Sequence, residues 1–287
     1  MTSISFFLPG DADEAYCNIR DKTTGPAPEA RAFIESLWRR YRGLEDHNFL
    51  TDAKTHFLQR FWEMYLAVTF MERGLKPSRK GRGGGPEFSC SYKERKIWVE
   101  AVAPGPGDSA ADRVEEASTE GVTDLPEEKI LLRLTQALAQ KRERYLAALA
   151  KGIVSDQDCY VLGVNSKGIT QAYGALPFFF KALLPIGDPL LRIRATAKIT
   201  DSYYTLRETI TKARGSPVST TAFLDPQFAF LSAVIHSRVD CLNRPEELGE
   251  DFMVLHNPLA ARPLEPSVFK WCEQYVYNDG ELTIQAG

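Results

Sequence analysis

Two glutamates lie where a predicted β-hairpin would bring their carboxylates together. Glu87 precedes the run FSCSY at 88–92, and Glu100 lies near the end of IWVEAVA at 97–103, with the charged turn KERK between the runs. Antiparallel pairing around that turn places the two strands side by side. A carboxylate inside an apolar strand is costly unless it is paired or binds a metal. The two glutamates are therefore candidates for a functional site.

Two carboxylates that point at one place form a hard-oxygen site of the kind that Mg²⁺ prefers, with waters and phosphate oxygens as further ligands. A metal held in this way can lower the pKa of an attacking water and stabilise charge on a phosphodiester. The pattern therefore predicts Mg²⁺, or Mn²⁺ in its place, as the cofactor. Glu87 and Glu100 are the predicted ligands.

A helix predicted at 55–73 precedes the hairpin, and Gly74 follows it as a C-terminal cap. This helix has two apolar stripes, and a helix that is apolar on two faces is usually buried between layers. Its acidic residues are Glu63 and Glu72. Acids on a buried helix need a partner or a role, and Glu63 and Glu72 are the rival candidates for one.

A second long helix is predicted at 127–151, after the hairpin. Its apolar stripe consists of Ile130, Leu134, Leu138, Tyr145 and Leu149. Lys141 falls within this stripe, and a cation in such a position either extends to solvent or meets an acid. If the helix packs on the sheet, Lys141 could meet Glu100. Lys93 and Lys96 of the hairpin turn are alternatives that we expect at the far end of the hairpin.

Residues 57–165 resemble the core of the PD-(D/E)XK nuclease superfamily. That core has the order αβββαβ, which the two helices, the hairpin, a short strand at 75–78 and the buried run CYVLGVN at 159–165 would supply. The family signature is Pro-Asp on one strand and Asp/Glu-X-Lys on the next. Here Pro86-Glu87 matches the first part and Glu100-Ala101-Val102 matches the second, except that valine stands in the lysine position.

The resemblance implies a metal-dependent nuclease that hydrolyses DNA or RNA. Glu87, Glu100 and Glu63 would then bind metal, and Lys141 would replace the missing lysine. The basic residues of the Gly-rich loop would contact the substrate backbone. These residues are Lys76, Arg79, Lys80 and Arg82. The alternative, motivated by Val102 and an acidic pI, is an inactive member of the same fold that acts as a binding or scaffold protein. An unrelated α/β protein would lack a sheet with 88–92, 97–103 and 159–164 as neighbours.

The predicted fold class is α/β: a restriction-endonuclease-like αβββαβ core with a mixed central sheet, N-terminal helices and a C-terminal extension. We divide the chain into an N-terminal arm and helix (1–54), the core (55–170) and an extension on the same sheet (171–287). Residues 1–28 are expected to be an arm and 29–44 a helix. In the extension we predict a helix at 174–184 and strands at 190–197, 219–225, 231–240 and 251–258.

Bulk properties narrow the range of functions. The 287 residues are 44% hydrophobic and 25% charged. The net charge of −3 gives no support for tight non-specific binding of nucleic acid, but it leaves room for a local basic cleft. The five cysteines show no CxxC pair, which favours a reducing compartment. No signal peptide or membrane span is evident, so a cytoplasmic location without membrane contact is expected. There is no GxxxxGK[ST] or GxSxG motif.

Overall fold

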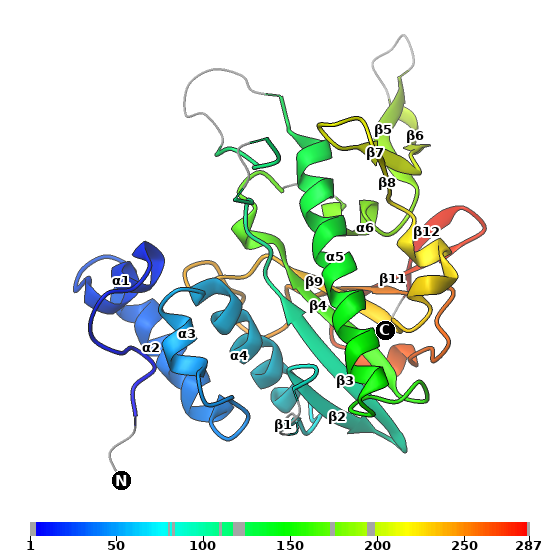
Figure 1. Cartoon of the computed structure of the whole chain (residues 1–287). Coiled ribbons are helices and arrows are strands. Elements are labelled where there is room, and N and C mark those ends of the chain that lie inside the picture. Colours follow the sequence, from blue (N-terminus) through cyan, green and yellow to red (C-terminus); the bar gives the residue numbers. More distant parts are fainter. Residues whose placement is uncertain are drawn as a thin grey trace.

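The computed structural model describes residues 4–79, 81, 84–108, 111–116, 124–172, 176–193 and 199–285. Over these residues the chain is a mixed α/β protein (Figure 1). The α-helices are α1 (Glu14–Asp21), α2 (Ala27–Tyr41), α3 (Phe49–Ala53), α4 (Phe57–Glu72), α5 (Glu127–Ala150) and α6 (Phe178–Lys181). The strands are β1 (Ser78–Arg79), β2 (Phe88–Tyr92), β3 (Arg95–Val102), β4 (Cys159–Asn165), β5 (Ile186–Ile193), β6 (Ile199–Leu206), β7 (Thr209–Thr211), β8 (Pro217–Ser219), β9 (Ala233–Ser237), β10 (Met253–His256), β11 (Glu273–Asn278) and β12 (Glu281–Gln285).

One large sheet organises the described residues. Its strand order is β1-β2-β3-β4-β9-β10-β11-β12. Strand β2 is antiparallel to both of its neighbours, whereas β3, β4 and β9 run parallel to one another. Along the chain, α4, β1, β2, β3, α5 and β4 follow the order αβββαβ. The segments around 88–92, 97–103 and 159–164 are therefore neighbours in a single mixed sheet.

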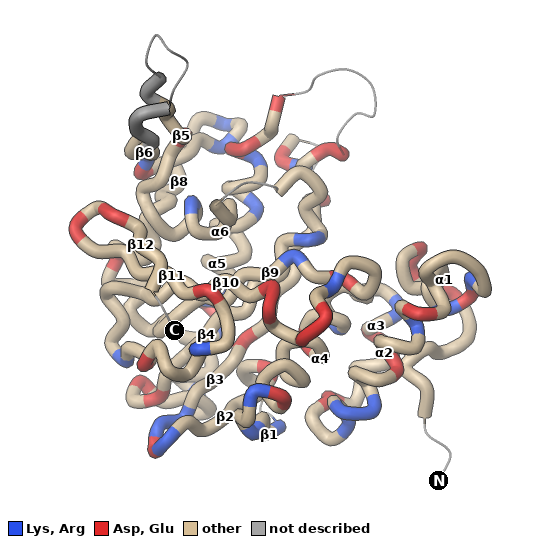
Figure 2. Tube along the Cα trace, turned by 180° about the vertical axis from the view of Figure 1, so that it is seen from behind, with Lys and Arg blue, Asp and Glu red and all other residues tan. Residues whose placement is uncertain are grey.

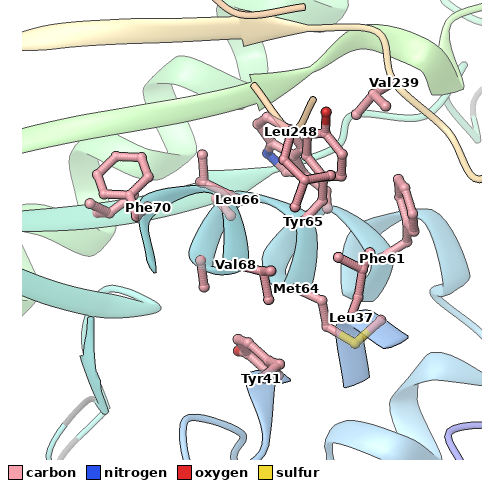
Figure 3. Close-up of a cluster of buried hydrophobic side chains, with 14 of the residues drawn as sticks. Leu37, Tyr41, Phe61, Met64, Tyr65, Leu66, Val68, Phe70, Val239 and Leu248 are labelled. Carbon is pink, nitrogen blue, oxygen red and sulfur yellow. The ribbon is translucent and has the colours of Figure 1, made fainter. Parts of the chain in front are cut away.

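Helix α4 lies between the sheet and the N-terminal helices, because its apolar residues surround it. Met64 and Val68 lie on the side that faces α2, and Leu66 and Phe70 lie on the side that faces the sheet (Figure 3). The helix ends before Gly74, whose φ of 82° is left-handed backbone that glycine adopts without strain. The prediction of a buried two-faced helix is confirmed in this part of the chain.

Helix α5 covers the opposite face of the sheet (Figure 1). Alternate residues of β3 divide between the two faces: Val99 and Ala101 join the core around α4, and Trp98 joins the core around α5. Glu100 has the same parity as Trp98, so it lies on the α5 face. This geometry aims a residue of β3 at the helix that carries Lys141.

The expectation of an N-terminal arm at 1–28 is wrong. Asp13 caps α1 by accepting a hydrogen bond from the backbone of Tyr16 at 2.8 Å. Phe6 and Tyr16 are both fully buried, and the Tyr16 hydroxyl accepts a 2.6 Å hydrogen bond from the backbone of Leu8. Two aromatic side chains thus fix a segment whose polar, turn-rich composition suggested an arm.

The C-terminal third extends the sheet through β9 and β10, at the predicted places, and through β11 and β12, which the sequence did not predict. Strand β5 instead pairs with β6 in a separate two-stranded sheet, and residues 194–197 of the strand predicted at 190–197 lie outside the described residues. The strand predicted at 219–225 is wrong, because 222–224 form a 3₁₀ turn. The predicted helix at 174–184 is short, with α6 only at 178–181.

Acidic and basic residues are interspersed along most of the trace (Figure 2). No helix in the described part of the chain is long and apolar enough to cross a membrane. Any recognition of a charged ligand therefore depends on a local grouping of charges and not on one uniformly basic face.

Candidate active site

The β2–β3 ladder ends with the pair of Phe88 and Val99, and Glu87 and Glu100 are the next residue on each strand beyond that pair. Continuation of the same register would set these two side chains opposite each other, on the same side of the sheet. Both side chains are buried, Glu87 at 8% and Glu100 at 2% exposure. Like charges opposite each other are destabilising, so this pair requires a compensating cation.

Lys141 supplies a cation at Glu100. Its ammonium donates hydrogen bonds to Oε1 of Glu100 and, at 2.8 Å, to the carbonyl oxygen of Ala101. The side chain comes from the middle of α5 and is buried, as its place in the apolar stripe requires. The structure therefore brings to Glu100 an amine that Val102 cannot provide.

Glu63 enters the same region from α4. Its carboxylate accepts hydrogen bonds from Gln59 Nε2 at 2.8 Å and from Arg60 at 2.7 Å. Gln59 also donates to the carbonyl of Ala101 at 3.3 Å and accepts from the backbone of Ala103 at 2.7 Å. One amide side chain thus links Glu63 to the end of the strand that carries Glu100.

The carboxylates affect each other's protonation. Burial raises the pKa of Glu63 to about 8, and the carboxylate of Glu87 adds to this shift while Arg60 opposes it. Burial also raises the pKa of Glu100, Lys141 lowers it, and Glu87 again raises it. Glu87 therefore acts on both of the other glutamates, although they come from opposite sides of the sheet.

Two buried tyrosines support this placement. The pKa of the Tyr41 hydroxyl on α2 is raised by burial and then by Glu63 and Glu87. The pKa of Tyr160 on β4 is raised by burial and then by Glu100 and Glu87. The pKa of each tyrosine is thus raised by Glu87 together with one of the other two carboxylates. The start of β2 lies between the Glu63 side and the Glu100 side of the site.

The three glutamates do not form a closed ligand cluster. In the described part of the chain, no group of three or more His, Cys, Asp or Glu side chains is arranged to hold a metal ion. Mg²⁺ commonly binds through one or two carboxylates and keeps several waters. The pair of Glu87 and Glu100 fits that habit, with Glu63 close enough to act through the electrostatic field.

Two cavities adjoin this site. The smaller one has a volume of about 270 Å³, and Glu100 lies in its wall. Its other lining residues are Gly84, Gly85, Pro86, Arg144, Ala147, Ala148, Lys151, Ile153 and Tyr160. The larger one, about 810 Å³, is lined by Asp46, His47, Asn48, Asp52, Arg79, Gly81 and Gly84. Gly84 borders both, so the segment after β1 separates the two openings.

The predicted substrate-contacting residues divide into two groups. Lys76 and Arg79 are exposed, and Arg79 pairs with Phe88 through β1 and lines the larger cavity. Lys80 and Arg82 lie outside the described residues. Among the described basic residues of this loop, Arg79 therefore lines the larger cavity, whereas Glu100 lies in the wall of the smaller one.

The alternative acids and amines lie elsewhere. Glu72 is paired with Arg40 on the surface and does not join the site. Lys93 pairs with Glu265, and the ammonium of Lys96 lies 3.9 Å from the centre of the Trp98 ring. Both lysines belong to the far end of the hairpin, as expected from the sequence. Of the candidate acids and lysines, the fold brings Glu63 and Lys141 to the pair of Glu87 and Glu100.

Sequence reasoning missed Gln59, Arg60, Arg144 and Tyr160. Helical spacing could have indicated three of them, because Arg144 follows Lys141 by three residues and Gln59 and Arg60 precede Glu63 by four and three. Tyr160 has no such signal. It reaches the site only through the parallel register of β3 and β4, in which it pairs with Trp98.

The arrangement combines two buried carboxylates, a buried ammonium and a nearby guanidinium on the wall of a cavity. Carboxylates hold hard cations, and the two cationic groups can stabilise negative charge on a phosphate oxygen. This arrangement could hold a hard cation beside groups that stabilise charge on a phosphate. Comparison of the chain with protein-family models, curated proteins and solved structures finds no match.

Proposed function

We propose that the chain is a divalent-metal-dependent nuclease that hydrolyses phosphodiester bonds of DNA or RNA and resembles the PD-(D/E)XK superfamily. The observation that carries the proposal is the contact of Lys141 with Glu100, beside the buried Glu87. A buried lysine, a strand carboxylate and a second buried carboxylate are the chemical groups that the family signature brings together.

The order of the elements supports a restriction-endonuclease-like core. Helix α4, strands β1 to β3, helix α5 and strand β4 follow the family's αβββαβ order. Strands β2, β3 and β4 are neighbours in one mixed sheet, with α4 and α5 on its two faces. The N-terminal helices and strands β9 to β12 then elaborate this core.

Glu87 and Glu100 would hold Mg²⁺ or Mn²⁺. A metal bound there lowers the pKa of a coordinated water and offsets charge on the phosphodiester. Lys141 opposes the rise that burial causes in the pKa of Glu100 and presents an ammonium beside this carboxyl group. Gln59 and Arg60 orient Glu63, and a cation bound nearby would oppose the burial that raises the pKa of this carboxyl group.

The same contact favours the catalytic interpretation over the scaffold alternative. A scaffold has no need for a lysine buried against a strand carboxylate, and replacement of such a pair by apolar residues is often neutral or stabilising. In this chain Lys141 is buried against Glu100, which lies at a cavity wall, and Glu87 is buried just before β2. These features support a site under functional constraint.

The proposal is tested by incubation of the purified protein with single- and double-stranded DNA and RNA in Mg²⁺ or Mn²⁺, and in EDTA. We expect cleavage that EDTA abolishes. Glu87→Gln and Glu100→Gln should each lower the rate at least about 100-fold, because each removes an anionic ligand at constant volume. Glu72→Gln, which changes an exposed acid outside the site, is the matched control and should cleave like wild type. Failure of the wild-type protein to cleave any of these substrates would remove the proposal.

A further inference from the structure

The α5 wall of the smaller cavity carries a pattern that the proposed chemistry does not explain. Arg144, Ala147, Ala148 and Lys151 all line it, and their spacing places them on one face over two turns of the helix. Two long cations therefore flank two of the smallest side chains. The space between the cations is part of the cavity, because nothing larger than a methyl group projects from α5 there.

The cavity is also lined by the turn of Gly84, Gly85 and Pro86, which leads into β2. A Cβ atom on Gly85 would lie 2.8 Å from Cγ2 of Ile153, and its φ of 109° is a conformation that other residues rarely adopt. The turn is thus packed closely against the end of α5. It forms a firm wall from which no side chain of Gly84 or Gly85 fills the cavity.

The guanidinium of Arg144 has donors to spare. It lies 3.6 Å from Oε1 of Glu100, a distance typical of an ion pair and too long for a hydrogen bond, and 69% of the side chain is exposed. Arg144 donates no hydrogen bond to any described residue, whereas Arg142, two positions earlier, bonds Glu143 and Gln227. A guanidinium has five N–H donors that suit phosphate oxygens.

The ion pair with Glu100 leaves the hydrogen-bond donors of Arg144 available for a ligand. Lys141 already bonds the Glu100 carboxylate directly, so the more distant guanidinium adds only a weak attraction there. Arg144 and Lys151 remain as two cations at the mouth of a 270 Å³ cavity that is also lined by a Gly-Gly-Pro turn. Such a cavity suits a small tetrahedral anion with part of its ester.

We propose that this cavity is a phosphoryl-binding pocket, in which Arg144 and Lys151 bind a phosphate group of the nucleic-acid substrate next to the Glu87–Glu100 pair. The identity of the ligand as nucleic acid rests on the proposed function; the binding of a phosphoryl group does not. The group is either an internal diester of the strand or a monoester at its end. The chemistry of binding is the same for both.

The first experiment measures the affinity for inorganic phosphate by titration calorimetry in EDTA. Arg144→Ala and Lys151→Ala should each weaken binding roughly tenfold or more, because each removes a charge-assisted contact. Ala147→Leu, which fills the cavity from an exposed helix position, should abolish it. Ala150→Leu adds the same side chain at an exposed position of α5 outside the cavity and should bind like wild type. Thermal unfolding of each variant checks that it is folded.

The second experiment distinguishes an internal diester from a terminal monoester. It compares the affinity of the protein for one dinucleotide with and without a terminal phosphate. At least about tenfold tighter binding of the phosphorylated form, lost in Ala147→Leu, assigns the pocket to a strand end. Equal binding of both forms, again lost in Ala147→Leu, assigns it to an internal diester. The pocket is refuted if wild type binds none of these probes or if Ala147→Leu binds them like wild type.

These results are independent of cleavage. A protein that binds phosphate through Arg144 but cleaves nothing would retain the pocket and lose the nuclease proposal. A protein that cleaves with Mg²⁺ while Ala147→Leu binds and cleaves like wild type would retain the nuclease proposal and lose the pocket.

Discussion

Glu100 and Lys141 are each buried, so neither charge has water to stabilise it and each depends on the other. Removal of one partner from a buried ion pair is strongly destabilising, while removal of both charges is tolerated far better. The sequence left two alternatives for Lys141, which interrupts an apolar stripe: extension to solvent or contact with an acid such as Glu100, and the structure shows the contact. The sequence did not predict Arg144 or Tyr160 beside them, since their positions depend on how α5 and β4 are packed against β3.

This dependence predicts the stability of two variants. Lys141→Met leaves Glu100 buried without its ammonium and should lower the free energy of unfolding by about 3–5 kcal/mol. Lys141→Met/Glu100→Gln removes both charges and should recover about half of that loss. Chemical denaturation at neutral pH measures both values. Equal stability of the single and double variants would contradict the claim that the unpaired charge of Glu100 causes the loss.

At the scale of elements, α4 packs on the sheet where β4 has a glycine. A Cβ on Gly163 would lie 2.6 Å from Cδ2 of Leu66, and Trp62 donates a 3.0 Å hydrogen bond to the Gly163 carbonyl. The sequence predicted α4, the β2–β3 hairpin, α5 and β4 from local patterns. It could not predict the β5–β6 pairing or β11 and β12, because strand partners are set by contacts distant in sequence.

Gly163→Ala should therefore separate α4 from the sheet and lower the free energy of unfolding by about 1–3 kcal/mol. Gly105→Ala is a matched control, because a Cβ there meets nothing within 4 Å. Gly163→Ala/Leu66→Ala, which removes the clashing side chain, tests the cause. If the double variant loses at least as much free energy of unfolding as Gly163→Ala and Leu66→Ala lose together, the steric explanation is wrong.

His236 at the end of β9 provides a pH prediction. It is buried, shares a 2.9 Å hydrogen bond with Ser166 after β4, and burial with a contribution from Arg238 lowers its pKa from 6.5 to about 3. Between these values the unfolded chain binds a proton that the folded protein does not, so stability falls as pH falls below 6.5. The expected loss from this group is about 2 kcal/mol between pH 6.5 and pH 5.

The measurement compares unfolding free energies of wild type and His236→Gln at pH 7 and pH 5. The variant lacks the titrating group, so it should lose less stability on acidification than wild type, whatever its stability at pH 7. Equal losses in both proteins would mean that His236 is protonated in the fold or that its burial is not maintained.

The whole molecule is held by cores that cross the boundaries suggested by the sequence. The core around α4 extends from Phe6 to Phe269 and includes residues of the N-terminal helices, the central strands and the C-terminal third. Composition and charge did not reveal this continuity. A segment with few apolar residues can still be fixed when two of them, Phe6 and Tyr16, are completely buried.

Phe6→Ala should consequently lower the free energy of unfolding by about 3–5 kcal/mol, the usual cost of removing a buried aromatic ring. The rings of Tyr16, Trp38 and Phe57 lie within 6.0, 6.2 and 6.3 Å of Phe6, centre to centre. Ile4→Ala, at a residue that is 55% exposed, is the control and should change little. Denaturation followed by fluorescence and by circular dichroism should give coincident transitions. A loss below about 1 kcal/mol would indicate that the N-terminal segment is not part of the core.

The central claim is that an amine from α5 takes the place of the lysine that Val102 replaces. It is tested most directly by the rate of Mg²⁺-dependent cleavage of the preferred substrate by wild type, Lys141→Met and Val102→Lys/Lys141→Met. Val102 follows Glu100 by two residues, so a lysine there projects from the same face. We predict at least a 100-fold loss in Lys141→Met, as estimated for removal of one stabilising group, and recovery of at least about tenfold in the double variant. Cleavage by Lys141→Met at the wild-type rate would contradict the account.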